Sequence, residues 1–148
     1  MTYDLVRVAE HVHGHLGWLA AGALVHPAIL LRHVKRRAHL SVALSTGFVT
    51  AVGLVGVWLY SPYRDRIKQG IFIDAPSVGF LFERKEHLAF GAIFLAWAGA
   101  AAYAAAIGAS DEVRGPLRSV AHWAFVAAAL LAVATAALGT AVASFRSF

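Results

Sequence analysis

Charged residues occur in clusters along this chain, and long uncharged stretches separate the clusters. Residues 11–31, 38–63, 87–110 and 119–145 contain no Asp, Glu, Lys or Arg. Each stretch exceeds the roughly 20 apolar residues that a helix needs to cross the hydrocarbon core of a bilayer. Segment 124–144 (AFVAAALLAVATAALGTAVAS) also lacks the polar face that a surface helix of a soluble protein needs. The pattern therefore predicts membrane helices.

We predict one all-α domain over residues 1–148, a bundle of four transmembrane helices in up-down-up-down order. The expected spans are 15–31, 39–60, 87–109 and 119–143. Residues 61–86 form the longest connection, and Asp74, Pro76 and Gly79 interrupt its apolar centre. We expect this segment to lie along the membrane interface or to fold over the bundle.

Composition agrees with this picture, because 59% of the residues are hydrophobic and only 14% are charged. A soluble domain usually carries about a quarter of charged residues. The absence of cysteine excludes disulfides, thiolate metal sites and covalently attached c-type haem. The N-terminal flank has two acids and one arginine, so we expect a retained N-terminus rather than a basic leader peptide.

The net charge of +5 does not indicate a nucleic-acid partner, because the basic residues lie in short segments beside the spans. There they contact lipid headgroups and set topology. The densest basic segment is the turn 32–37 (RHVKRR). We therefore expect the short loops on the inner side of the cell membrane and both termini on the outer side.

Eight histidines are present, and their positions suggest a cofactor site. His15 and His26 are eleven residues apart, so they share one helix face and lie about 16 Å apart along the axis. Gly22 lies between them on that face. On an interior face, a glycine would let a flat group or a neighbouring helix approach closely.

Histidines on other spans lie at matching depths. His87 opens the third span at the same side of the bundle as His15, and His122 opens the fourth span at the side of His26. The expected pairs are His15 with His87 and His26 with His122. His39, at the start of the second span, is the substitute at the second side.

With these residues, the chain resembles the small four-helix membrane b-type cytochromes, such as the haem-bearing anchor subunits of respiratory complexes. The resemblance covers the four spans and rests on His15, Gly22, His26, His87 and His122. It implies one or two b haems, each held by two histidines from different helices. It also implies electron transfer with a quinone, or with other membrane or redox subunits, as partner.

The chemistry of haem is compatible with the rest of the sequence. Two imidazole ligands leave no open position on the iron, which suits electron transfer rather than oxygen chemistry. Anionic propionates would need cations near the membrane faces. Arg84 or Lys85 at one side and Arg32 or Arg118 at the other are placed for this role.

Two other interpretations remain open. His11, His13 and His15 offer three imidazoles near one membrane face, which would suit a protein that handles copper, zinc or nickel. Alternatively, the chain is a cofactor-free structural or assembly subunit. In that case the histidines at the helix ends lie among the headgroups.

Overall fold

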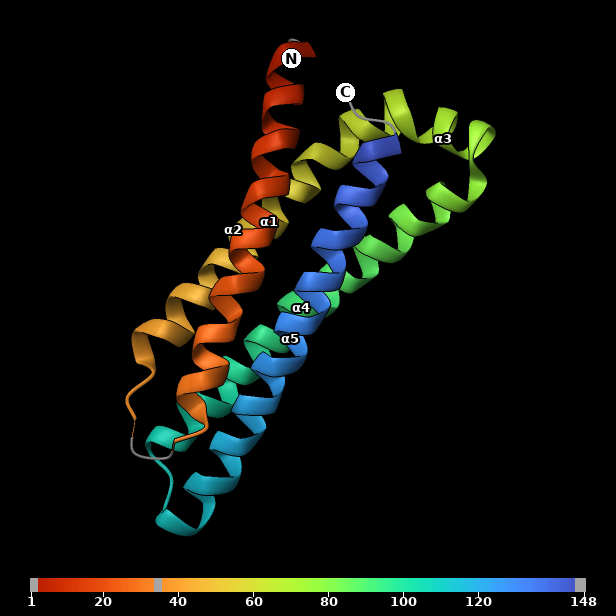
Figure 1. Cartoon of the computed structure of the whole chain (residues 1–148). Helices are drawn as coiled ribbons and strands as arrows, with labels where there is room; N and C mark the ends of the chain where they lie inside the picture. Colours follow the sequence, from red (N-terminus) through yellow and green to blue (C-terminus); the bar gives the residue numbers. More distant parts are fainter. Residues whose placement is uncertain (1–2, 34–35, 146–148) are drawn as a thin grey trace.

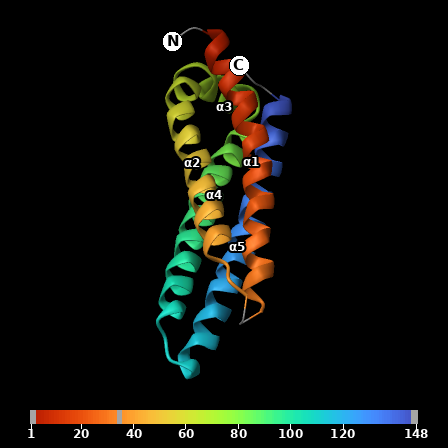
Figure 2. The ribbon, with the colours of Figure 1, turned by 90° about the vertical axis from the view of Figure 1, so that its left-hand side faces the viewer.

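The computed structural model describes residues 3–33 and 36–145, and nearly all of them are helical. The helices are α1 (Tyr3–Leu31), α2 (His39–Tyr63), the π-helix η1 (Arg64–Lys68), α3 (Gln69–Asp74), α4 (Pro76–Ile107) and α5 (Asp111–Phe145). The four long helices α1, α2, α4 and α5 run alternately up and down the bundle (Figures 1 and 2). The predicted all-α four-helix bundle is confirmed.

The two ends of the bundle differ in what they carry. Both ends of the chain and the α2–α4 connection lie at one end, which we call the terminal end (Figure 1). The short connections 32–38 and 108–110 lie at the other, which we call the loop end. This is the arrangement expected for four consecutive crossings.

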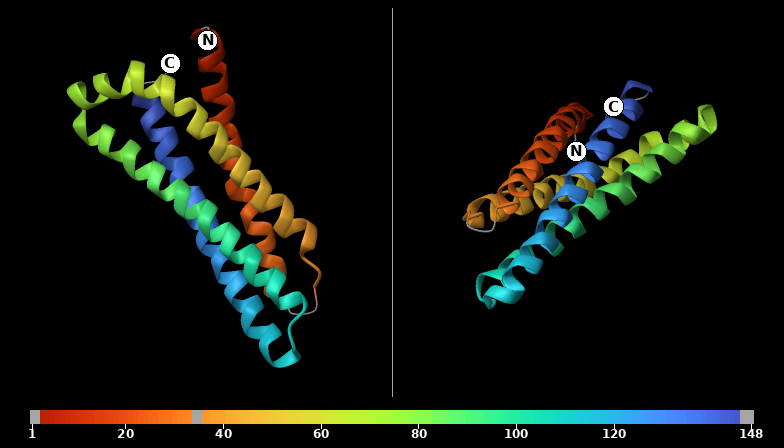
Figure 3. Two further views of the ribbon diagram at one scale, coloured as in Figure 1. Left: turned by 180° about the vertical axis from the view of Figure 1, so that it is seen from behind. Right: turned by 60° about the horizontal axis from the view of Figure 1, so that its bottom comes forward.

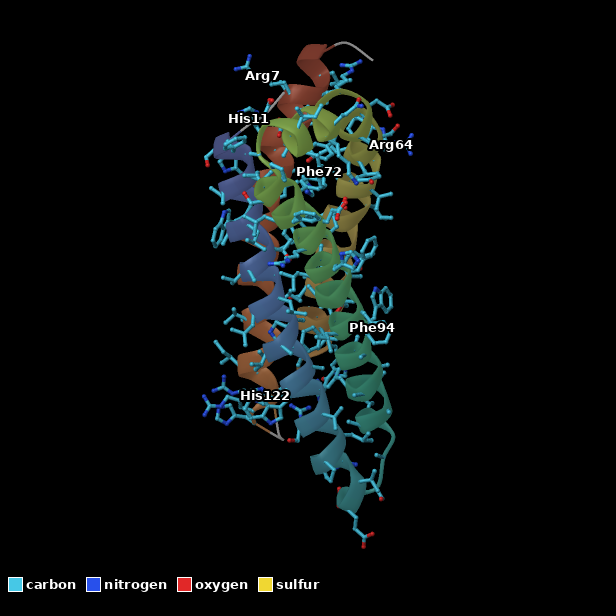
Figure 4. The ribbon with its side chains drawn as sticks, turned by 90° about the vertical axis from the view of Figure 1, so that its right-hand side faces the viewer. Arg7, His11, Arg64, Phe72, Phe94 and His122 are labelled. Atoms are coloured by element: carbon cyan, nitrogen blue, oxygen red, sulfur yellow. The ribbon has the colours of Figure 1, made fainter. Side chains whose placement is uncertain are left out.

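Four helices in the described part of the chain are long and apolar enough to cross a membrane. Their most apolar windows have mean hydropathies of 1.4 to 2.2, yet only 28% to 33% of each window is buried. Large apolar side chains on the outside include Leu44, Leu54 and Phe94, the last of which is 74% exposed (Figure 4). An outer surface of this kind is compatible with a multi-pass membrane protein, because lipid replaces water around it.

The helices extend beyond the predicted spans. α1 begins at Tyr3 and α4 begins at Pro76, well before the expected starts near residues 15 and 87. The 61–86 segment is therefore not a separate layer. It completes α2, continues through η1 and α3, turns at the terminal end (Figure 3), and enters α4. The only non-helical residue on this path is Ala75, at φ −153° and ψ 78°. Proline disfavours helical geometry in the residue before it and fits the first turn of the helix that follows.

Small residues let the long helices pack closely. Gly99 of α4 lies against the ring of Phe125 on α5, which is fully buried. Ala92, Ala96 and Ala121 are also buried in the same core cluster. α1 packs against α2 and α5, and α4 packs against the same two helices. α1 and α4 therefore lie at opposite corners of the bundle.

Candidate functional site

The predicted histidine face of α1 lies on the outside of the bundle. His15, Gly22 and His26 are all exposed, whereas Leu24 on the other side of the helix is fully buried. A Cβ atom added to Gly22 would meet nothing within 4 Å. The three residues share a face as predicted, but the face is not interior. The expectation that Gly22 opens space inside the bundle is wrong.

The structure does not bring His15 and His87 together. They lie on α1 and α4, at opposite corners of the bundle, and both are exposed. The Nδ1 atom of His87 donates a hydrogen bond to the carbonyl of Glu83 one turn earlier, at 2.8 Å. Arg84, the predicted propionate partner on α4, is exposed as well.

At the loop end, His26 connects α1 to α2. Its Nδ1 atom is hydrogen bonded to Ser41 Oγ at 2.8 Å. One turn further along α2, the hydroxyl of Ser45 donates to the carbonyl of Ala23 at 2.7 Å. Pro27 cannot donate to that carbonyl, so the hydroxyl replaces the missing helix bond. His26 is thus not needed to satisfy the proline site, and its second ring nitrogen, Nε2, points elsewhere.

His122 approaches α1 from the opposite flank. It lies at the loop end of α5 (Figure 4), where its Nδ1 donates to the carbonyl of Ala28 at 2.8 Å. His26 is tied to α2, whereas His122 links α5 to α1. The two rings therefore lie on different sides of α1, and the structure does not bring this predicted pair together.

The substitute ligand His39 lies closer to His26 than His122 does in the arrangement of elements. Both residues line one groove between α1 and the start of α2, with a volume of about 310 Å³. The remaining lining residues include the cation Arg37, the hydroxyl of Ser41 and three apolar side chains, Leu30, Ala38 and Leu40. The groove thus combines two imidazoles from different helices with one positive charge and an apolar wall.

Arg118 has a different role from the predicted one. Its side chain is buried, and its guanidinium donates to the carbonyls of His33 and Arg36 at 2.8 and 3.0 Å. It also lies 5.4 Å from the ring centroid of Tyr103. The Tyr103 hydroxyl accepts a hydrogen bond from the backbone N–H of Ala38 at 2.9 Å. Arg118 and Tyr103 therefore hold the loop before α2, which carries one wall of the groove.

Sequence reasoning missed an interior polar cluster at the terminal end. His13 on α1, Tyr63 on α2 and Lys85 on α4 face the inside of the bundle. One signal was present in the sequence. His13 precedes the buried Leu24 by eleven residues, so the two share a helix face. Interior ionisable groups in a membrane bundle are rare and usually functional.

The three histidines near the N-terminus do not converge. His11 is exposed and bonds to the Arg7 carbonyl, His13 faces inward, and His15 faces outward. Among the described residues, no group of three or more His, Cys or acidic side chains is placed to hold a metal ion. Comparisons of the chain with family models, with curated proteins and with solved structures gave no match.

Proposed function

We propose that the chain is a membrane b-type cytochrome that carries electrons through one haem at the loop end, with His26 and His39 as axial ligands. The observation that carries the proposal is the groove lined by both imidazoles. When bound, haem would supply a one-electron couple at its iron. Everything else in the site is the work of this chain.

The hydrogen bond of His26 supports a ligand role. Histidines that bind metals usually pass their second ring nitrogen to a hydrogen-bond partner, which fixes the ring orientation. For His26 that partner is Ser41 on the neighbouring helix. With Nδ1 engaged there, Nε2 is the nitrogen left for the iron. An intrahelical bond such as that of His87 is less specific, since His11 makes the same bond.

The groove walls also suit the cofactor. Leu30, Ala38 and Leu40 give an apolar surface for the porphyrin, and Arg37 gives a cation for a propionate. Arg37 takes the place that the sequence analysis assigned to Arg118, whose guanidinium is engaged with backbone carbonyls. Two imidazoles close both axial positions, so electron transfer is favoured over oxygen chemistry.

We further propose that a quinone or a redox subunit exchanges electrons with this haem, because the chain itself has no soluble catalytic domain. The basic turn 32–37 supports placing the loop end, and with it the haem, on the inner side of the cell membrane.

The test is the spectrum and haem content of the purified protein, made with ample haem supply. We expect a reduced-minus-oxidised spectrum of low-spin b haem and about one haem per chain. His26→Ala and His39→Ala should each abolish haem binding, because one imidazole cannot hold six-coordinate iron. His15→Ala and His87→Ala are matched controls on outer faces and should keep full haem content. A colourless wild-type protein would refute the function. Haem loss in the two controls alone would place the cofactor at the terminal end instead.

A further inference from the structure

The interior cluster at the terminal end contains two buried polar atoms that lack a hydrogen-bond partner among the described residues. They are Nδ1 of His13 and the hydroxyl of Tyr63. Tyr63 is only 7% exposed. A buried polar group without a partner is costly, and in a native structure it usually has a function or contacts a bound water.

The positions of both side chains are set by packing. The imidazole of His13 lies against Gly56 of α2, where an added Cβ would lie 3.1 Å from Cε1 and 3.4 Å from Nε2. The ring of Tyr63 stacks on Phe82 of α4, with centroids 3.9 Å apart. Glycine at position 56 thus leaves room for an imidazole inside the bundle.

Lys85 brings a positive charge to the same region. Its ammonium lies 4.2 Å from the centroid of Phe82, the ring on which Tyr63 stacks. Its alkyl chain lies against Gly139 of α5, 3.5 Å from the position of an added Cβ. The charge interacts with His13 on α1 and with Glu10 and Glu86. Groups from α1, α2 and α4 therefore meet around this lysine, and α5 contributes a glycine.

Titratable groups continue from this cluster to the surface. Glu86 interacts with Lys85 and with Lys68 of η1. Lys68 forms an ion pair with Glu83 at 3.1 Å and donates to the Tyr60 hydroxyl at 3.5 Å. The groups that face the cluster are Glu10 and His13 from α1, Tyr60 and Tyr63 from α2, Lys68 from η1, and Glu83, Lys85 and Glu86 from α4.

We propose that His13, Tyr63 and Lys85 form an internal proton-exchange site that reaches the water at the terminal end through Glu86. The proton leaves the Lys85 ammonium, whose nitrogen keeps the electron pair, and binds the lone pair of the His13 imidazole. Net charge is unchanged. A proton is released when it passes to the Glu86 carboxylate and then to water. Two positive charges at close range inside the bundle repel, so the pair holds one proton.

This proposal does not depend on haem. Its test is the proton affinity of His13, measured by NMR of histidine-labelled protein in nanodiscs, with the His13 signal assigned from His13→Asn. Lys85→Met should increase the proton affinity of His13 at least tenfold, because the imidazolium then no longer faces a second positive charge. Arg84→Met is the matched control. It removes the same charge from the adjacent, exposed position and should leave His13 unchanged. Equal effects of the two variants would overturn the proposal.

Glu86→Gln provides a second measurement if Lys85→Met does not fold. It removes the carboxylate that accepts the proton and keeps the size of the side chain. Exchange of the His13 ring proton with water should slow at least tenfold, whereas the exchange of the exposed His15 stays the same. An unchanged exchange rate at His13 would show that Glu86 is not the route to water.

Discussion

Replacing Gly99 with leucine will lower the free energy of unfolding by about 3 kcal/mol, because the new side chain has no space between α4 and α5. A Cβ at this position would lie 2.9 Å from two ring atoms of Phe125 and 3.3 Å from the backbone oxygen of Ala121. The ring is fully buried and the backbone cannot yield. The two helices must separate instead, and they lose the close packing on which membrane helix pairs depend.

Thermal unfolding in detergent, followed by circular dichroism, measures this effect. Gly22→Leu is the matched control, since it gains the same helix propensity at a position with open space around it. We expect the control to unfold within about 0.5 kcal/mol of the wild type. If both leucine variants are equally stable, the α4–α5 contact described above is not the main packing interface.

Removing Arg118 should give the second large effect, a loss of about 3 kcal/mol, with the change concentrated at the loop end. Two backbone carbonyls, those of His33 and Arg36, would each lose a charged hydrogen-bond donor. Such bonds contribute about 1.5–3 kcal/mol each. The segment before α2 would be released, and hydrogen exchange at Ala38 should rise because its N–H bond to Tyr103 depends on the same packing.

Comparison of Arg118→Ala with Arg32→Ala tests this account. Arg32 is an exposed residue at the same end of the bundle, so its loss should change stability by no more than about 0.5 kcal/mol. Arg118→Lys should recover only part of the stability, because an ammonium lacks the planar fork that reaches two acceptors. Equal stability of the two alanine variants would mean that charge at the loop end matters and the buried position does not.

The four helices were predictable because membrane insertion leaves a strong mark on composition. The gaps between charges are long, and no special contact is needed to recognise them. The ends of the helices were less predictable. Helix α4 continues outward to Pro76 through Arg84 and Lys85, because charged residues near a membrane face do not stop a helix. Only the proline, with the extended Ala75 before it, does so.

The side of α1 that faces the core could not be found from its histidines. Helix periodicity shows that His15 and His26 share a face, but it does not say whether that face is inside. The answer depends on the partner helices. Gly56 of α2 leaves room for His13, and Gly139 of α5 leaves room for Lys85, so these two residues point inward. Such a fit involves residues far apart in the sequence, and no pattern within α1 reveals it.

The π-helical turn of η1 has a consequence for how this chain tolerates changes in length. A π turn contains one residue more than the corresponding α-helical turn, so the ladder of hydrogen bonds after Pro62 carries a built-in insertion. Deleting one residue within Arg64–Lys68 would convert the turn to ordinary α-helix. It would rotate α3 by about 100° relative to α2 and leave the spacing within each long helix intact. The hairpin at the terminal end is thus the place where the chain can be shortened while the four-helix core keeps its register.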